Sequence, residues 1–223
     1  MSPAKGVAKG APRAKGAAAP LGAPARVRIR ARLEGDERRA QLLALGLESF
    51  SGRAYDEVSI DDIAQRAGTS KGLLYHYFPT KRDFYAATVR EAARQLLEKT
   101  RPDERLGPME KLAAGLDAYI AFVEHHGRAY TALIRGGIGT DAEVASVLEG
   151  ARREILDRIL RDSPAEIRED GRYRLALRGW IGFVEAAIIE WAEQPVMDRE
   201  SLRGLLERIF TRTVEATLPG APR

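Results

Sequence analysis

The 223-residue sequence contains no cysteine, which excludes disulfide bonds, thiolate zinc sites and cysteine nucleophiles and fits a reducing cytoplasm. Two of its three histidines, His125 and His126, are adjacent, so they point to different sides of a helix and do not make a metal pair. No apolar run approaches the roughly 20 residues that a membrane helix needs. The longest, residues 180–192, is interrupted by Glu185 and Glu190. We therefore expect a cytoplasmic chain that neither crosses a membrane nor binds a metal.

Signals for catalysis and export are also missing. The glycine-rich stretch at residues 136–140 lacks both a preceding strand and the Lys-Ser/Thr pair of a phosphate loop. No nucleophile and base stand in motif spacing, and no cofactor loop is present. Near the N-terminus, Pro20, Gly22 and Pro24 interrupt the only candidate for a secretory core. A helical enzyme is the weaker interpretation, and we expect no cofactor.

What the sequence does contain is a pair of short helical segments within residues 58–81. Ser59 and Asp62 have capping-box spacing and predict a helix start at Ser59. Gly68 can leave that helix at positive φ, and Thr69 and Ser70 offer a new N-cap. Two helices joined by such a turn are the helix-turn-helix arrangement that enters the DNA major groove. An ordinary corner between two helices, with Tyr75 and Tyr77 half-buried, fits the same spacing.

The stretch SIDDIAQRAGTSKGLLYHYFPTKRDFY resembles the DNA-binding signature of the TetR family of bacterial transcriptional regulators. Nearly every position of the family pattern is matched in register over about residues 36–96. The resemblance implies a sequence-specific DNA-binding regulator with double-stranded operator DNA as its partner. We expect a repressor, although the sequence itself does not distinguish a repressor from an activator. Carried over by position, the implied DNA-binding residues are Ser59, Thr69, Ser70, Lys71, Gly72, Leu73, Tyr75, His76, Tyr77 and Lys81.

The predicted DNA-binding residues are expected to have two different roles. The resemblance implies that Lys71, Gly72 and Leu73, with Tyr75 and His76, face bases and phosphates. It implies that the residues that mainly hold the backbone are Thr69, Ser70, Tyr77 and Lys81. Leu73 replaces the small or hydroxyl residue often found there, which predicts apolar contact with a thymine methyl group.

The basic charge is concentrated at the N-terminus. Residues 1–33 hold eight Lys or Arg and no acid, so the remainder carries 28 basic and 32 acidic residues, 28 − 32 = −4. Residues 1–35 are predicted to be a disordered basic tail, because Ala, Gly, Pro and Lys bury too little apolar surface to fold. Alternating arginines at 26, 28, 30 and 32 suit an arm along DNA, and a solubilising tail remains the alternative. A nonspecific DNA-coating protein driven by this tail is therefore the competing function.

The chain is predicted to be all-α, and from Glu104 onward no strand-like alternation of any length occurs. A three-helix head at residues 36–96 begins with a helix over 36–50, and the next helix follows at 81–100. A C-terminal helical domain at residues 97–223 carries regulation, ligand binding and dimerisation, with helices predicted at 104–126, 128–135, 140–161, 171–194 and 198–218 and a short turn near 163–166.

The C-terminal domain is predicted to bind both a small-molecule effector and a second copy of the chain. Small and apolar residues of the last two helices suit a homodimer, with interface candidates Gly182, Ala186, Ile189, Leu202, Leu205 and Ile209. A two-fold dimer implies a palindromic operator with half-sites about 34 Å apart. The resemblance also implies a ligand pocket, for which the candidates are Tyr119, Phe122, His126, Tyr130, Arg135, Trp180, Phe183 and Glu185.

Overall fold

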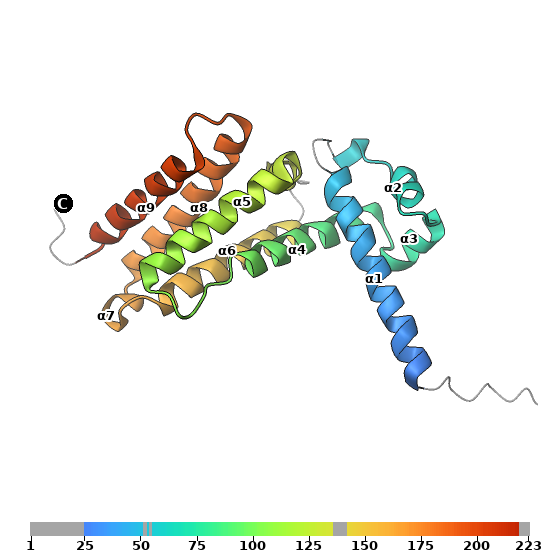
Figure 1. The fold of residues 1–223 in the computed structure, drawn as a ribbon, viewed down its shortest axis with the longest axis horizontal. Coiled ribbons are helices and arrows are strands. Elements are labelled where there is room, and N and C mark those ends of the chain that lie inside the picture. The colour runs from blue at the N-terminus through green and yellow to red at the C-terminus, as the bar shows by residue number, and fades with distance from the viewer. Residues whose placement is uncertain (1–24, 51–52, 54, 136–141, 219–223) are drawn as a thin grey trace, which may run out of the picture. The chain divides into compact units, whose positions relative to one another are not determined.

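A computed structural model describes residues 25–50, 53, 55–135 and 142–218, with the side chains of 25–34 and 127–135 outside that description. Every regular element in these ranges is helical, as the sequence predicts (Figure 1). The elements are α1 (Ala25–Ser49), the 3-10 turn η1 (Tyr55–Glu57), α2 (Ile60–Arg66), α3 (Lys71–Tyr77), α4 (Lys81–Lys99), α5 (Pro108–Arg135), α6 (Ala142–Arg161), α7 (Ala165–Arg168), α8 (Gly171–Glu193) and α9 (Arg199–Glu215).

Two helix boundaries differ from the sequence prediction. Helix α1 begins at Ala25 rather than at residue 36, so the prediction of disorder through residue 35 is wrong for residues 25–35. Arginine and alanine make up six of the eleven residues of that stretch, and both are strong helix formers. Helix α5 continues through Gly127 to Arg135, where two helices were predicted. An interior glycine costs only about 1 kcal/mol relative to alanine, which a long helix can absorb.

Residues 1–37 and 38–223 form two separate units. In the first unit, residues 25–37 are helical. The second unit contains two clusters of buried side chains. One, called here the head cluster, includes Leu42, Ile63, Leu74 and Phe84, and the other, the core cluster, includes Ile120 and Leu177.

Helix α4 is shared by both clusters. Phe84 to Ala92 supply buried side chains to the head cluster, and Leu96 belongs to the core cluster. The predicted domain boundary after residue 96 therefore falls inside a continuous helix, and the division into 36–96 and 97–223 stays a prediction. Helices α5, α8 and α9 lie side by side in the core, and α6 packs along α4 and α8 (Figure 1).

Candidate DNA-binding and ligand-binding sites

The turn between α2 and α3 has a defined hydrogen-bond pattern. Gly68 takes φ +61°, and its amide donates to Gln65 O at 3.0 Å while the Thr69 amide donates to Ala64 O at 2.9 Å. This is the Schellman ending of a helix, which needs a residue that tolerates the left-handed conformation. The Ser70 hydroxyl then caps α3 by accepting from the Leu73 amide at 3.1 Å. The predicted turn residues therefore fix where α3 begins.

The neighbouring helices are capped as the spacing predicts. The Ser59 hydroxyl accepts from the Asp62 amide at 3.3 Å at the start of α2. Thr80 and Asp83 form a reciprocal capping box at the start of α4, where both hydrogen bonds measure 3.0 Å. Of the predicted DNA-binding residues, Ser59 and Ser70 thus have hydroxyls engaged in holding the backbone.

Helix α3 has one buried side and one open side. Leu74 and Phe78, at 0% and 3% exposure, anchor it in the head cluster. Its front and outer side are exposed at Lys71, Gly72, Leu73 and His76. Tyr75 and Tyr77 are half-buried and pack against the head cluster, as an ordinary helical corner would also require. The exposed side therefore combines donors, a bare backbone position and one apolar side chain.

The two lysines near the exposed side of α3 each contact a neighbouring group of the protein. The ammonium of Lys71 lies 2.9 Å from the Asp61 carboxylate, and the hydrogen bond to Asp61 together with its charge raises the pKa of Lys71. Lys81 sits 4.6 Å above the Tyr55 ring and donates to Asp56 O at 3.2 Å. Lys81 thereby joins the start of α4 to η1.

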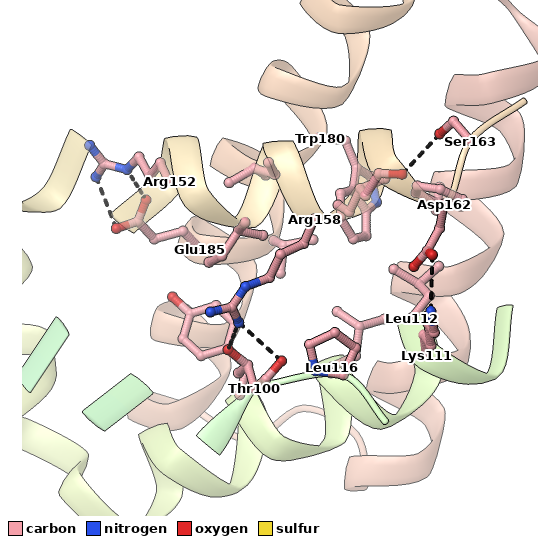
Figure 2. Close-up of a pocket in the computed structure, with 18 of the residues that line it drawn as sticks. Thr100, Lys111, Leu112, Leu116, Arg152, Arg158, Asp162, Ser163, Trp180 and Glu185 are labelled. Atoms are coloured by element: carbon pink, nitrogen blue, oxygen red, sulfur yellow. Dashed lines mark hydrogen bonds and ion pairs between the residues drawn. The ribbon is translucent and has the colours of Figure 1, made fainter. Parts of the chain in front are cut away.

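The helical core encloses a cavity of about 430 Å³ (Figure 2). Side chains from α4, α5, α6, α8 and α9 line it, with Ile167 of α7. Most of the lining is apolar, including Leu96, Leu112, Leu116 and Ile155. A small number of polar groups in a largely apolar cavity is the usual composition of a site for a small molecule.

The polar groups of the lining are paired with one another. Arg152 makes a two-pronged ion pair with Glu185, at 2.7 and 2.9 Å (Figure 2). Lys111 lies 2.9 Å from Asp162 and 2.6 Å from Glu104, and these two partners raise the pKa of its ammonium.

Two more polar contacts connect the lining to nearby helices. Arg158 donates to the end of α4, to Leu97 O at 2.9 Å. It also donates to Thr100 O at 3.3 Å (Figure 2). The Ser163 and Tyr173 hydroxyls share a hydrogen bond of 2.8 Å.

Comparison with known proteins identifies both halves of the chain. Residues 42–88 match the bacterial regulatory proteins, tetR family, and residues 108–213 match the tetracyclin repressor-like C-terminal domain. A tetR-family transcriptional regulator from Streptomyces coelicolor is 33% identical, with TM-score 0.69 over 80% of each chain. This chain belongs to the TetR family. It is accordingly a DNA-binding transcriptional regulator and not an enzyme.

Two further TetR relatives are informative. The HTH-type transcriptional activator FasR of Mycolicibacterium smegmatis is 33% identical over 60% of this chain, a match that spans 64% of FasR, less than two thirds of its length. The FadR regulator of Bacillus subtilis, solved in complex with stearoyl-CoA, has the same fold with TM-score 0.64 and 21% identity. That alignment covers 76% of this chain and 96% of the FadR chain.

The structure brings three of the predicted ligand residues to the cavity of this TetR protein. Tyr119, Trp180 and Glu185 line it, although the Trp180 indole N–H donates to Leu206 O and Glu185 pairs with Arg152. Tyr130 and Arg135 lie in the part of α5 whose side chains are outside the described residues.

The other three predicted ligand residues lie elsewhere. Phe122 and His126 contact each other on α5, with ring centroids 4.3 Å apart. His126 is about two helical turns past Tyr119, beyond the lining residues of α5. Phe183 is 41% exposed on α8 and does not line the cavity. Sequence reasoning missed Lys111, Arg152, Arg158 and Asp162, because it favoured aromatic residues and gave ion pairs no weight.

The predicted dimer residues also separate into two groups. Ile189 and Leu202 are buried within the chain's own core, each at 3% exposure, and Ile209 packs against that core. Gly182 and Leu205 are half-buried and Ala186 is exposed. The outer side of α8 instead carries Leu175 and Phe183, 75% and 41% exposed. With Gly179, Gly182 and Ala186 these residues form one stripe at spacings of three and four, called here the α8 stripe.

Among the described residues, no helix is long and apolar enough to cross a membrane. Within the same part of the chain, no group of three or more His, Cys, Asp or Glu side chains is arranged to hold a metal ion.

Proposed function

We propose that this TetR-family chain is a homodimeric repressor that binds a palindromic operator and is controlled by a ligand with a long apolar chain. The observation that carries the proposal is the position of α4, which contributes Phe84 to the head cluster and Leu96 to the cavity lining. A ligand that moves α4 therefore acts on the packing of the recognition helix. If the ligand binds better to one of the two positions of α4, it shifts the protein between a state that binds the operator and a state that does not.

The ligand class follows from the cavity and from one relative. A lining that is apolar apart from a few charged pairs fits an acyl chain better than a polar metabolite. The B. subtilis FadR structure contains stearoyl-CoA, and we carry this ligand class over to the present chain. The inferred effector is a long-chain acyl thioester or the corresponding fatty acid.

The α8 stripe supports the homodimer. Leu175 and Phe183 leave apolar surface that a second copy can bury, and Gly179 and Gly182 allow a close helix approach. A Cβ atom added at Gly182 meets nothing within 4 Å in the chain itself. Gly182→Leu should therefore leave the fold intact and weaken the dimer, as measured by sedimentation equilibrium.

The matched control for the dimer is Gly150→Leu. Gly150 lies on α6 and is likewise open to 4 Å. A Gly182→Leu protein that remains as dimeric as Gly150→Leu would contradict the α8 stripe as the interface.

The DNA-binding part of the proposal is tested by titrating the protein against duplexes tiled across its own upstream region, with scrambled DNA as control. A regulator should prefer one palindromic tile by about a thousandfold or more over the others. Equal weak binding to every tile would favour the competing function, tail-driven nonspecific association. Adding stearoyl-CoA should release the preferred tile, and transcription from it in vitro should rise on release. A fall in transcription on release would contradict repression but leave specific operator binding intact. That outcome would instead match the activator role for which FasR is named.

A further inference from the structure

Arg158 connects the cavity to the end of α4, and this inference rests on the proposed function. Its side chain is 16% exposed and lines the cavity from α6. Its Nη1 atom donates to Leu97 O at 2.9 Å. The same atom donates to Thr100 O at 3.3 Å, with the Thr100 hydroxyl at 3.5 Å (Figure 2). Thr100 is the C-cap of α4. Arg158 is thus a capping group that another helix supplies.

The contact is favourable because of what a helix end lacks. The last carbonyl groups of a helix have no partner within it and carry partial negative charge. A guanidinium placed against them satisfies these acceptors and interacts well with the helix dipole. Removing it leaves partly buried carbonyls without their donor.

Arg158 differs from the other cations of the cavity lining in what it binds there. Arg152 is held by two oxygens of Glu185, and Lys111 by two carboxylates. The Nη1 group of Arg158 donates to neutral oxygens, while its Nε atom lies 3.0 Å from the Glu154 carboxylate. All of these bonds have a charged donor, but only an ion pair adds the attraction between two opposite full charges, which a neutral carbonyl oxygen does not supply. An incoming acceptor therefore competes most easily for the Nη1 group of Arg158.

Apart from apolar packing, α4 and α6 also meet through an exposed polar cluster near the other end of their contact. Glu143 lies 2.7 Å from Arg90 and 3.9 Å from Arg82, and all three side chains are at least 40% exposed. Exposed pairs of this kind contribute little. The Arg158 contact is therefore the polar link between α4 and α6 most able to hold α4 in place.

We infer that Arg158 is the positioning residue through which the ligand acts on α4. A carboxylate or thioester oxygen in the cavity takes the Nη1 hydrogen bonds from Leu97 and Thr100, and the end of α4 loses its cap. Because α4 also packs in the head cluster, loss of the cap alters the placement of the recognition helix. The Arg158→Met protein therefore behaves without ligand as the original protein behaves with it.

Three variants of the full chain test this. Arg158→Met keeps the length and apolar stem, and Arg158→Lys keeps the charge but loses the planar fork. Arg161→Met, on the same helix with a side chain 62% exposed, is the matched control. Circular dichroism and thermal melting establish that each variant folds. Two readouts follow: hydrogen exchange of the α4 C-terminal turn in the free protein, and operator affinity with and without stearoyl-CoA.

In Arg158→Met, amides of the last turn of α4 should exchange on the order of 10- to 100-fold faster, the range expected for losing hydrogen bonds to a charged group. Without ligand, its operator affinity should fall about tenfold or more. The further change on adding stearoyl-CoA should shrink by the same factor. Arg158→Lys should lie between the original protein and Arg158→Met, and Arg161→Met should match the original protein in both readouts.

The inference is overturned if Arg158→Met keeps the original ligand-free operator affinity, even if its melting temperature falls, because Arg158 is then a structural cap only. It is equally overturned if exchange in α4 is unchanged. If the original protein does not respond to stearoyl-CoA, the proposed ligand class fails instead. Exchange and ligand-free operator affinity still decide the role of Arg158 in that case.

Discussion

Replacing Gly72 by alanine should separate stability from DNA binding in this protein. Gly72 is the second residue of α3 and is exposed, and a Cβ atom there would meet only the Ser70 hydroxyl, at 3.9 Å. The fold therefore does not require glycine at this position. Alanine in a helix is favoured over glycine by about 0.5–1 kcal/mol, so the variant should be slightly more stable. For a chain of this size that gain raises the melting temperature by about 1–4 °C.

DNA binding should change in the opposite direction. If the front of α3 approaches the duplex as the TetR resemblance implies, a methyl group at residue 72 stands between the backbone and the DNA. Losing one hydrogen bond to a charged phosphate costs about 1.5–3 kcal/mol, which corresponds to roughly 10- to 150-fold in the operator Kd. Fluorescence anisotropy with the preferred duplex and a scrambled one, at one fixed salt concentration, measures the change.

Gly150→Ala is the matched control for this comparison. Gly150 is exposed in the interior of α6, and nothing lies within 4 Å of a Cβ added there. The control should gain similar stability with unchanged operator affinity. A Gly72→Ala protein that binds the operator as tightly as Gly150→Ala would refute the assignment of the α3 front to the DNA contact.

Three other predictions concern stability and salt dependence. Gly46→Ala should lower the free energy of unfolding, measured in urea, by about 1–3 kcal/mol. The added Cβ would lie 2.6 Å from Thr88 Oγ1 and 2.7 Å from Phe84 Cζ, and both side chains are fully buried. Stability equal to that of Gly150→Ala would contradict this prediction. Replacing Arg26, Arg28, Arg30 and Arg32 by glutamine should flatten the slope of log affinity against log salt by about 0.9 for each phosphate that the variant no longer neutralises, and an unchanged slope would exclude the tail from DNA binding. Burial, with the charges of His125 and Lys99, lowers the pKa of His126 below 6.5, so the unfolded chain binds more protons near that pH. Stability should therefore fall as pH decreases through 6.5 and His126 becomes protonated, and His126→Gln should remove part of that slope in urea titrations at several pH values; an unchanged slope would contradict the assignment.

The local signals of the helix-turn-helix could be predicted because they depend on neighbours in the sequence. Ser59, Gly68 and Ser70 each act on a backbone group within five residues, so spacing alone defines their partners. The capping box of Thr80 and Asp83 is of the same kind. A single glycine is a weaker indication that a helix ends than a capping residue is that a helix begins. Gly127 did not end α5, since propensity is a small term beside the packing of a long apolar face.

The polar lining of the cavity could not be predicted in this way. Arg152 and Glu185 are 33 residues apart, and Arg158 reaches a carbonyl group 61 residues before it. Periodicity assigns each residue to a side of its helix, but the identity of the opposing helix depends on how the helices pack. Surface charge and a buried ion pair look the same in sequence. The aromatic residues Phe122 and Phe183 were therefore favoured over the cations that the fold places in the lining.

Helical phase separates only some of the predicted interface residues on α8, because Ile189 has the phase of Gly182 and Ala186 and is nevertheless buried. Ile189 and Leu202 were predicted to face a partner, yet they complete the core of their own chain. A helix at the edge of a bundle buries one apolar side internally, so apolar residues repeating on a second side are the ones free for a partner. Leu175 and Phe183 repeat with Gly179, Gly182 and Ala186 on that second side, which differs from the side of Leu177, Val184 and Ile188. Separating the two phases would have placed Phe183 on the exposed side of α8 rather than among the cavity candidates.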